Sequence, residues 1–74
     1  MDVRRRQEDR RTATRRALVA AARTLFAQKG YAATSTPEIV KAAGVTRGAL
    51  YHHFADKQAL FAAVVEEEHD RGNH

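Results

Sequence analysis

One stretch of the chain decides its fold: residues 43–54, which read AGVTRGALYHHF. Gly44 interrupts an apolar pattern, and glycine readily adopts the left-handed conformation found just past the end of a helix. Thr46 can then cap the next helix, because its hydroxyl can accept a hydrogen bond from a free N–H of the first turn. The stretch therefore predicts a short turn between two helices, the second of which covers Arg47 to His53.

The helix before this turn is predicted over residues 37–43. Ser35 and Glu38 are three residues apart and fit a capping box, and Pro37 is tolerated in a first turn because its missing N–H has no helical partner. A helix of two turns is unstable alone, so it must be held by its neighbours. The apolar residues expected to hold it are Ile39, Ala43, Val45 and Leu50. Two short helices joined by a glycine turn are typical of a DNA-binding helix-turn-helix, and the spacing alone fits an ordinary helical hairpin equally well.

Two longer helices flank this pair. Apolar residues recur at helical spacing between Leu18 and Phe26, which predicts a helix over residues 13–29 that Thr12 or Thr14 caps and Gly30 ends. Asp56 is the expected cap of a last helix from Lys57 toward Arg71. No segment alternates with period two, so no strand is predicted. The residues expected in the core are Leu25, Phe26, Leu50, Phe54 and Leu60.

Charge is concentrated at the N-terminus. The 74 residues carry a formal net charge of +4, and residues 1–16, with seven arginines and three acids, account for all of it. Residues 17–65 carry an excess of positive charge, which the acidic residues 66–74 cancel. Such an arm attracts polyanions, or it is a solubilising tail that contacts nothing. We predict a disordered basic arm over 1–11, a folded domain over 12–65, and an acidic, polar end of the last helix and tail over 66–74.

Several classes of protein are excluded or disfavoured by composition. A chain of 74 residues has little interior for a catalytic cleft, and it shows no nucleophile–base pair, so we expect no enzyme and no cofactor. With no cysteine, it has no disulfide or thiolate metal site. His52 and His53 are adjacent on a helix and point about 100° apart, so we expect no shared metal ion. The apolar run over 59–65 is far shorter than the roughly 18 residues of a membrane span, so we expect a cytoplasmic protein without a membrane partner.

Two runs carry a family resemblance: LFAQKGY at residues 25–31 and AGVTRGALYHHF at residues 43–54. With the positions around them, they closely resemble the N-terminal DNA-binding domain of TetR-type transcriptional repressors, over about residues 12–65 and without gaps. The resemblance implies an all-α, homeodomain-like fold, in which a three-helix helix-turn-helix domain is followed by the start of a fourth helix. It also implies a sequence-specific DNA-binding domain that binds a palindromic operator. The alternative is a small helical protein-interaction or dimerisation module with a basic tail.

The resemblance also implies roles for single residues. The helix over 47–53 would enter the major groove, where Arg47 can donate two hydrogen bonds to guanine, Gly48 lets the backbone approach closely, and Ala49 offers a methyl group to thymine. The residues expected to read bases are Arg47, Gly48, Ala49, Tyr51 and His52. Those expected to contact phosphates are Ser35, Thr36, Thr46, Tyr51, His53 and Lys57. Separately from the resemblance, the charge of the arm leads us to expect that Arg4, Arg5, Arg6, Arg10 and Arg11 reach DNA.

Two residues depart from the family pattern. Val40 stands where helix-turn-helix motifs usually have alanine, which predicts a slightly wider separation of the two helices. Pro37 stands where some members have a side chain that contacts a base, and proline cannot make that hydrogen bond. Readout through residues 37–43 is therefore not expected.

The resemblance implies partners as well. Family members continue into a larger helical domain that binds a small-molecule inducer and forms the homodimer, so we expect both for the full-length protein. In the last helix the consecutive apolar residues 59–65 surround the axis, although only one face can pack on the core. We therefore expect these 74 residues to be mostly monomeric, with Phe61 and Val65 on a face without a partner.

Overall fold

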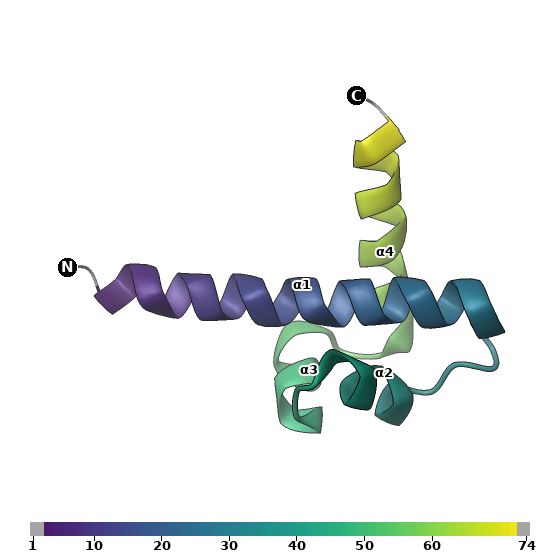
Figure 1. Cartoon of the computed structure of the whole chain (residues 1–74), viewed down its shortest axis with the longest axis horizontal. Coiled ribbons are helices and arrows are strands. Elements are labelled where there is room, and N and C mark those ends of the chain that lie inside the picture. The colour runs from purple at the N-terminus through teal and green to yellow at the C-terminus, as the bar shows by residue number, and fades with distance from the viewer. Residues whose placement is uncertain (1–2, 73–74) are drawn as a thin grey trace.

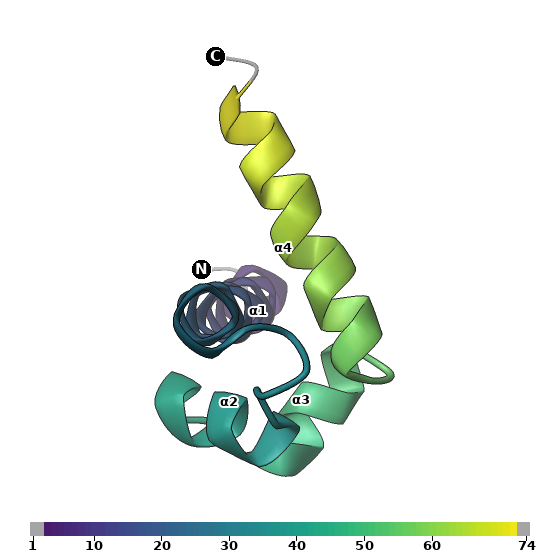
Figure 2. The ribbon, with the colours of Figure 1, turned by 90° about the vertical axis from the view of Figure 1, so that its right-hand side faces the viewer.

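Four α-helices form the part of the chain given by the computed structural model, which describes the backbone of residues 3–72 and the side chains of residues 10–67 (Figure 1). They are α1 (Val3–Lys29), α2 (Thr36–Ala43), α3 (Arg47–His53) and α4 (Lys57–Gly72). Residues 3–72 contain no strand, so the predicted all-α class is confirmed. The helices α2, α3 and α4 all pack on α1. Figure 2 looks along α1 and shows α2 and α3 together beneath it, with α4 crossing beside it.

The core lies where the second half of α1 meets the other three helices. Its buried residues are Leu18, Val19, Ala22, Ile39, Leu50, Phe54, Leu60, Ala63 and Val64. Leu50, Phe54 and Leu60 are buried as predicted, whereas Leu25 and Phe26 are only half-buried and pack against the edge of this cluster. The apolar face of α1 is therefore wider than the core that it covers.

The start of α2 is fixed by the predicted capping box. The Ser35 hydroxyl accepts a hydrogen bond from the backbone N–H of Glu38, and the Glu38 carboxylate accepts one from the backbone N–H of Ser35. The same carboxylate forms a salt bridge with the ammonium of Lys29, at the end of α1. The hydrogen bonds from Lys29 and Ser35 lower the pKa of Glu38. The cap therefore also connects α2 to α1.

The turn after α2 has the geometry that the sequence predicts. Gly44 has a φ of 71°, in the left-handed region that side chains with a Cβ rarely adopt. Its N–H donates to the Lys41 carbonyl at 3.2 Å, and the N–H of Val45 donates to the Val40 carbonyl at 3.2 Å. This pair of bonds is a Schellman motif, which satisfies carbonyls left free at the end of a helix. This motif therefore ends α2 at Ala43 and turns the chain at Gly44.

The next two helices also begin as predicted. The Thr46 hydroxyl accepts from the backbone N–H of Ala49 at 3.1 Å, and the Asp56 carboxylate accepts from that of Ala59 at 2.9 Å. These caps place the starts of α3 and α4 at the predicted residues. The helix α4 ends at Gly72, one residue beyond the predicted end.

The first helix differs from its prediction. It begins at Val3 rather than Ala13, so Thr12 and Thr14 lie inside it and neither caps it. In the structure, residues 3–11 of the predicted arm are helical and continuous with the packed part of α1. The physical reason is that residues 3–29 contain neither glycine nor proline, and a helix already formed by packing extends at the gain of one hydrogen bond per added residue. Within residues 3–72, no helix is both long and apolar enough to span a bilayer.

Candidate nucleic-acid interface

The outer face of α3 presents the residues predicted to read bases. Arg47, Gly48 and His52 are exposed, and Tyr51 is 48% exposed, which excludes a place for its ring in the core. Ala49 is half-buried. The opposite face holds Leu50 and Phe54 in the core, as their spacing of four predicts. The polar face of α3 therefore contributes nothing to the core and is available to a partner.

Gly48 is not required by the fold of this chain. A Cβ at this position would meet only the Thr46 hydroxyl oxygen, at an ordinary contact distance of 3.9 Å. Unlike Gly30 and Gly44, it does not have a positive φ. Neither steric crowding nor backbone conformation within the chain therefore requires glycine at position 48. A glycine on an exposed helix face is consistent with the close approach of another molecule to the backbone.

The predicted phosphate-binding hydroxyls are not equivalent. The Ser35 hydroxyl donates to the Glu38 carboxylate at 3.1 Å, so its proton is already used inside the cap. The Thr46 hydroxyl accepts from Ala49, and no acceptor for its own proton lies among the residues whose side chains are described. Thr36 is half-buried at the first turn of α2. Thr46 is therefore the hydroxyl best placed to donate to a phosphate.

Lys57 has an internal role that the sequence did not indicate. Its ammonium donates to the carbonyl oxygens of Tyr31 at 2.8 Å and Thr34 at 3.0 Å, and it lies 4.2 Å from the centre of the Tyr31 ring. An ammonium has three N–H donors, so one remains for the predicted phosphate contact. Lys57 therefore fastens the loop between α1 and α2 to the start of α4.

Thr34 completes this fastening from inside the loop. It is 1% exposed, and its hydroxyl donates to the Gly30 carbonyl at 2.8 Å, with the Leu25 carbonyl at 3.2 Å. On the other side of the loop, the rings of Phe26, Tyr31 and Phe61 pack together with centroids 5.1 to 5.6 Å apart. Phe61 therefore has partners on one side, although it is 41% exposed, and Val65 is 49% exposed. No sequence signal distinguishes a buried threonine in such a connection from an exposed one.

The end of α3 meets α1 at a basic cluster. The Arg15 guanidinium lies 5.4 Å from the centre of the Phe54 ring, and the rings of His52 and His53 are 5.5 Å apart and nearly perpendicular. Burial and the charges of His52, Arg15 and Arg11 lower the pKa of His53. At neutral pH, His53 is therefore an uncharged donor in the free protein. Arg15 was outside the predicted site, although the arginine run continues through residues 15 and 16.

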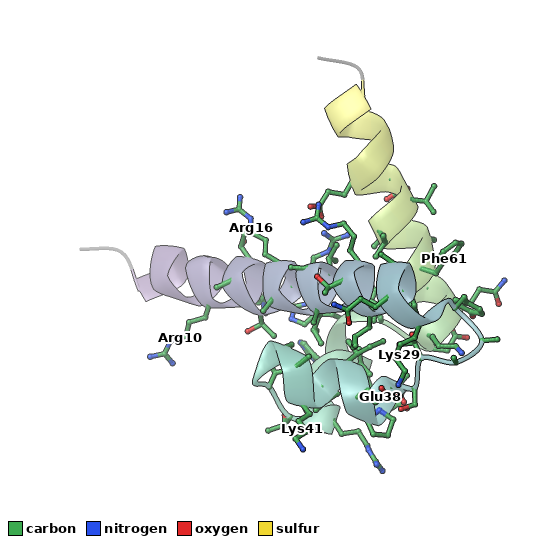
Figure 3. All side chains as sticks on the ribbon, turned by 45° about the vertical axis from the view of Figure 1, so that its right-hand side comes forward. Arg10, Arg16, Lys29, Glu38, Lys41 and Phe61 are labelled. Carbon is green, nitrogen blue, oxygen red and sulfur yellow. The ribbon has the colours of Figure 1, made fainter. Side chains whose placement is uncertain are left out.

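The described arginines in the N-terminal half of α1 point in different directions. The side chain of Arg10 extends to the side of α1 on which α2 lies, and that of Arg16 extends to the opposite side (Figure 3). Arg10 and Arg11 are both exposed. The side chains predicted at Arg4, Arg5 and Arg6 lie outside those described.

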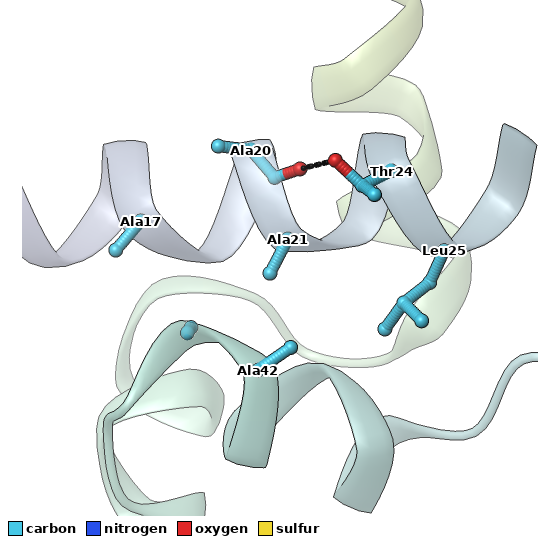
Figure 4. A pocket seen from close by; sticks show the side chains of 7 residues that line it. Ala17, Ala20, Ala21, Thr24, Leu25 and Ala42 are labelled. Atoms are coloured by element: carbon cyan, nitrogen blue, oxygen red, sulfur yellow. Dashed lines mark hydrogen bonds between the residues drawn. The ribbon is translucent and has the colours of Figure 1, made fainter.

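A shallow groove between α1 and α2 offers no catalytic group (Figure 4). Its lining consists of Ala17, Ala20, Ala21, Thr24, Leu25, Ala42 and Ala43. The Thr24 hydroxyl, its one polar side-chain group, donates to the Ala20 carbonyl at 3.0 Å. Among the described side chains, no group of three histidines or carboxylates is placed to hold a metal ion. This groove therefore offers no acid, no base and no metal ligand.

Residues 18–64 match the family described as bacterial regulatory proteins, tetR family. The chain belongs to the tetR family. The matched segment begins and ends at core residues, Leu18 and Val64, so it contains the whole buried cluster and the helix-turn-helix. The assignment to the tetR family thus rests on residues 18–64 and not on the basic arm.

Individual members of the tetR family agree with this assignment. The chain is 42% identical over 64 residues to an HTH-type transcriptional repressor of Mycobacterium tuberculosis, covering 86% of this chain and 34% of that one. It is 53% identical over 53 residues to the HTH-type transcriptional regulator AcrR of Shigella flexneri, covering 72% and 25%. The crystal structure of a TetR-family transcriptional regulator from Pectobacterium atrosepticum is similar, with a TM-score of 0.66, 48% identity, and coverage of 89% and 32%. The chain spans between a quarter and about a third of the length of these proteins.

Proposed function

We propose that this chain is the sequence-specific DNA-binding domain of a transcriptional repressor that acts in the bacterial cytoplasm, at the nucleoid. The observation that carries the proposal is the outer face of α3, where Arg47, Gly48, Tyr51 and His52 are exposed while the other face is fully used by the core. Membership of the tetR family supports the same function. The groove between α1 and α2, with no acid, base or nucleophile, favours no enzymatic reaction.

In this proposal α3 enters the major groove of the operator. Arg47, at the first turn of α3, donates two hydrogen bonds to O6 and N7 of a guanine, and Ala49 contacts a thymine methyl group. Gly48 allows the helix backbone to come close to the duplex. Thr46, the remaining donor of Lys57, and His53 contact phosphates, which set the register of α3 without reading the sequence.

We further propose that the complete regulator is a homodimer on a palindromic site. One copy of a helix-turn-helix reads one half-site, and two linked copies gain affinity through their high effective concentration. The relatives are about three to four times as long as the aligned region, which leaves room for a domain that forms the dimer and binds a small-molecule inducer. The isolated chain should therefore bind DNA only at about micromolar concentration.

The test is a selection of duplexes from random sequence, followed by competition binding with the selected and a scrambled duplex. Arg47→Ala should cost about 1–3 kcal/mol on the selected duplex and much less on the scrambled one. Arg16→Ala is the matched control, because it removes the same charge from the opposite side of α1 and should not change selectivity. Equal losses on both duplexes for Arg47→Ala would refute its base-reading role. Failure to enrich any sequence would favour the protein-interaction module instead.

A further inference from the structure

We propose that α1 carries a second DNA contact: the arginines on the sides of α1 that face the helix-turn-helix lie along the phosphate backbone that flanks the groove entered by α3, presented by a rigid helix. The partner is duplex DNA, and the contact rests on the proposed function. It would extend the bound site beyond the base pairs that α3 reads. The residues that carry it are Arg10, Arg11 and Arg15.

The first argument is direction. Arg10 points to the side of α1 where the helix-turn-helix lies, whereas Arg16 points away from it (Figure 3). Arg11 and Arg15 are four residues apart and therefore share a helix face. Both lie near enough to His53, at the end of α3, to influence its titration. The basic residues Arg11 and Arg15 of α1 therefore lie beside the end of α3.

The second argument is reach. The guanidinium of Arg15 is held over the Phe54 ring, and Leu18 and Val19 anchor the following turn in the core. From Arg15 back to Val3, α1 runs beyond α3 (Figure 1). At 1.5 Å per residue these twelve steps extend about 18 Å. This length corresponds to about five base pairs at 3.4 Å each, so the helix can follow a flanking strand.

The third argument is charge. Among the residues whose side chains are described, none of Arg10, Arg11 and Arg15 has an acidic partner. Burial lowers the pKa of His53, and the charges of Arg15 and Arg11 lower it further, so a bound anion would relieve the repulsion from these two arginines. Guanidiniums on the sides of α1 that face the helix-turn-helix are complementary to the regular negative charge of a DNA strand. If these arginines served only for solubility, the side of α1 on which each one lies would make no difference to DNA binding.

The experiment measures binding of the whole chain to two duplexes that contain the selected half-site, with two or eight base pairs of flanking DNA on the α1 side. With the long flank, Arg10→Ala should reduce the slope of log affinity against log salt concentration by about 0.9, the value for one phosphate contact. With the short flank, Arg10→Ala should have little effect. Arg16→Ala should leave the slope unchanged on both duplexes.

A second variant tests whether the helix must be rigid. Thr12→Pro breaks α1 ahead of its packed part, because proline lacks the backbone N–H and clashes with the preceding turn. The packed part should still form, because proline is tolerated in the first turn of a helix. This variant should weaken binding to the long duplex severalfold and leave the thermal midpoint of the core unchanged. Wild-type binding by Thr12→Pro would show that the arm acts without a helical connection and would overturn the proposal.

Other outcomes separate the two proposals. If no duplex is bound selectively, the proposed function fails as a whole. If selective binding persists but flank length and Arg10→Ala have no effect, only the α1 contact is wrong. Equal effects of Arg10→Ala and Arg16→Ala would show that the arginines act only through their charge, whichever side of α1 they lie on, and would refute the α1 contact. An effect of Arg10→Ala confined to binding of vesicles that contain anionic phospholipid would assign this surface to a membrane and refute the DNA contact.

Discussion

The helix-turn-helix and the N-terminal half of α1 are both helical, but they are stabilised in different ways. The helices α2 and α3 have 8 and 7 residues, have side-chain caps at their starts, and place Ile39 and Leu50 in the core. The stretch of α1 from residue 10 to residue 17 buries no side chain. The first region depends on tertiary packing and on specific capping bonds, whereas the second depends on extension from a helix that is already packed. Substitutions should therefore have very different effects in the two regions.

The largest effect is expected in the core of the helix-turn-helix. Ile39 is fully buried, so Ile39→Ala should lower the free energy of unfolding by about 2–5 kcal/mol. Urea denaturation followed by circular dichroism measures the loss, and Ile39→Val, with an expected loss of about 0.5–1.5 kcal/mol, gives a value if the alanine variant does not fold. Val65→Ala, at an exposed position of α4, is the control and should change little. A negligible loss for both Ile39 variants would show that α2 is not held by the core.

A smaller effect is expected at the turn, where one substitution can be compared at two glycines. Gly44→Ala places a side chain at a φ of 71° and should cost about 1–2 kcal/mol. Gly48→Ala adds the same methyl group where it meets only an ordinary contact, so stability should be unchanged or slightly higher. Affinity for the selected duplex should nevertheless fall for Gly48→Ala. Unchanged affinity would refute the close approach of α3 to DNA.

A still smaller effect on unfolding is expected in the N-terminal half of α1. Ala13→Gly, at an exposed position of α1, should reduce the helical signal in circular dichroism, because glycine disfavours a helix by about 1 kcal/mol relative to alanine. The midpoint of unfolding should not move, since Ala13 is exposed and takes no part in the core. Ala22→Gly is the matched change in the packed half of α1 and should lower that midpoint. Equal shifts of the midpoint would mean that the N-terminal half of α1 unfolds together with the core.

The smallest effect concerns the cap of α2 and its dependence on pH. The Lys29 and Ser35 hydrogen bonds lower the pKa of Glu38 in the folded chain, so the unfolded chain takes up its proton first as the pH falls. The stabilisation is complete above the ordinary pKa of 4.5 and is lost as the pH falls below it. Lys29→Met should therefore flatten the fall in stability below this pH. Lys41→Met removes a charge from an exposed position of α2 and should not flatten this fall. A flattening in both variants would show that the effect comes from net charge alone.

The same contrast explains how much of the fold the sequence could predict. The starts of α2, α3 and α4 are fixed by Ser35, Thr46 and Asp56 through bonds to residues three positions away, so local sequence was sufficient for them. The start of α1 was predicted ten residues too late, because extension of a packed helix leaves no capping signature at the place where packing ends.

Prediction of the candidate site was limited in a similar way. The exposed face of α3 follows from helical periodicity, and the structure agrees with it. The bonds of Lys57 to the carbonyls of Tyr31 and Thr34 join residues 26 and 23 positions apart, and no local pattern indicates them. Arg15 was missed because its position depends on the crossing of α1 and α3. The individual contacts to bases and phosphates remain predictions.

The division of α3 into an exposed and a buried face has a consequence for how such a domain can change over time. Arg47, Tyr51 and His52 are exposed and lie outside the core, so most replacements there should leave folding intact. Leu50, which lies between them in α3, and Phe54, which directly follows the helix, are buried and allow few replacements. A duplicated copy could therefore acquire a new operator through a few substitutions without a compensating change in its core. The same property makes positions 47, 51 and 52 suitable for a randomised library, from which binders of chosen sequences could be isolated.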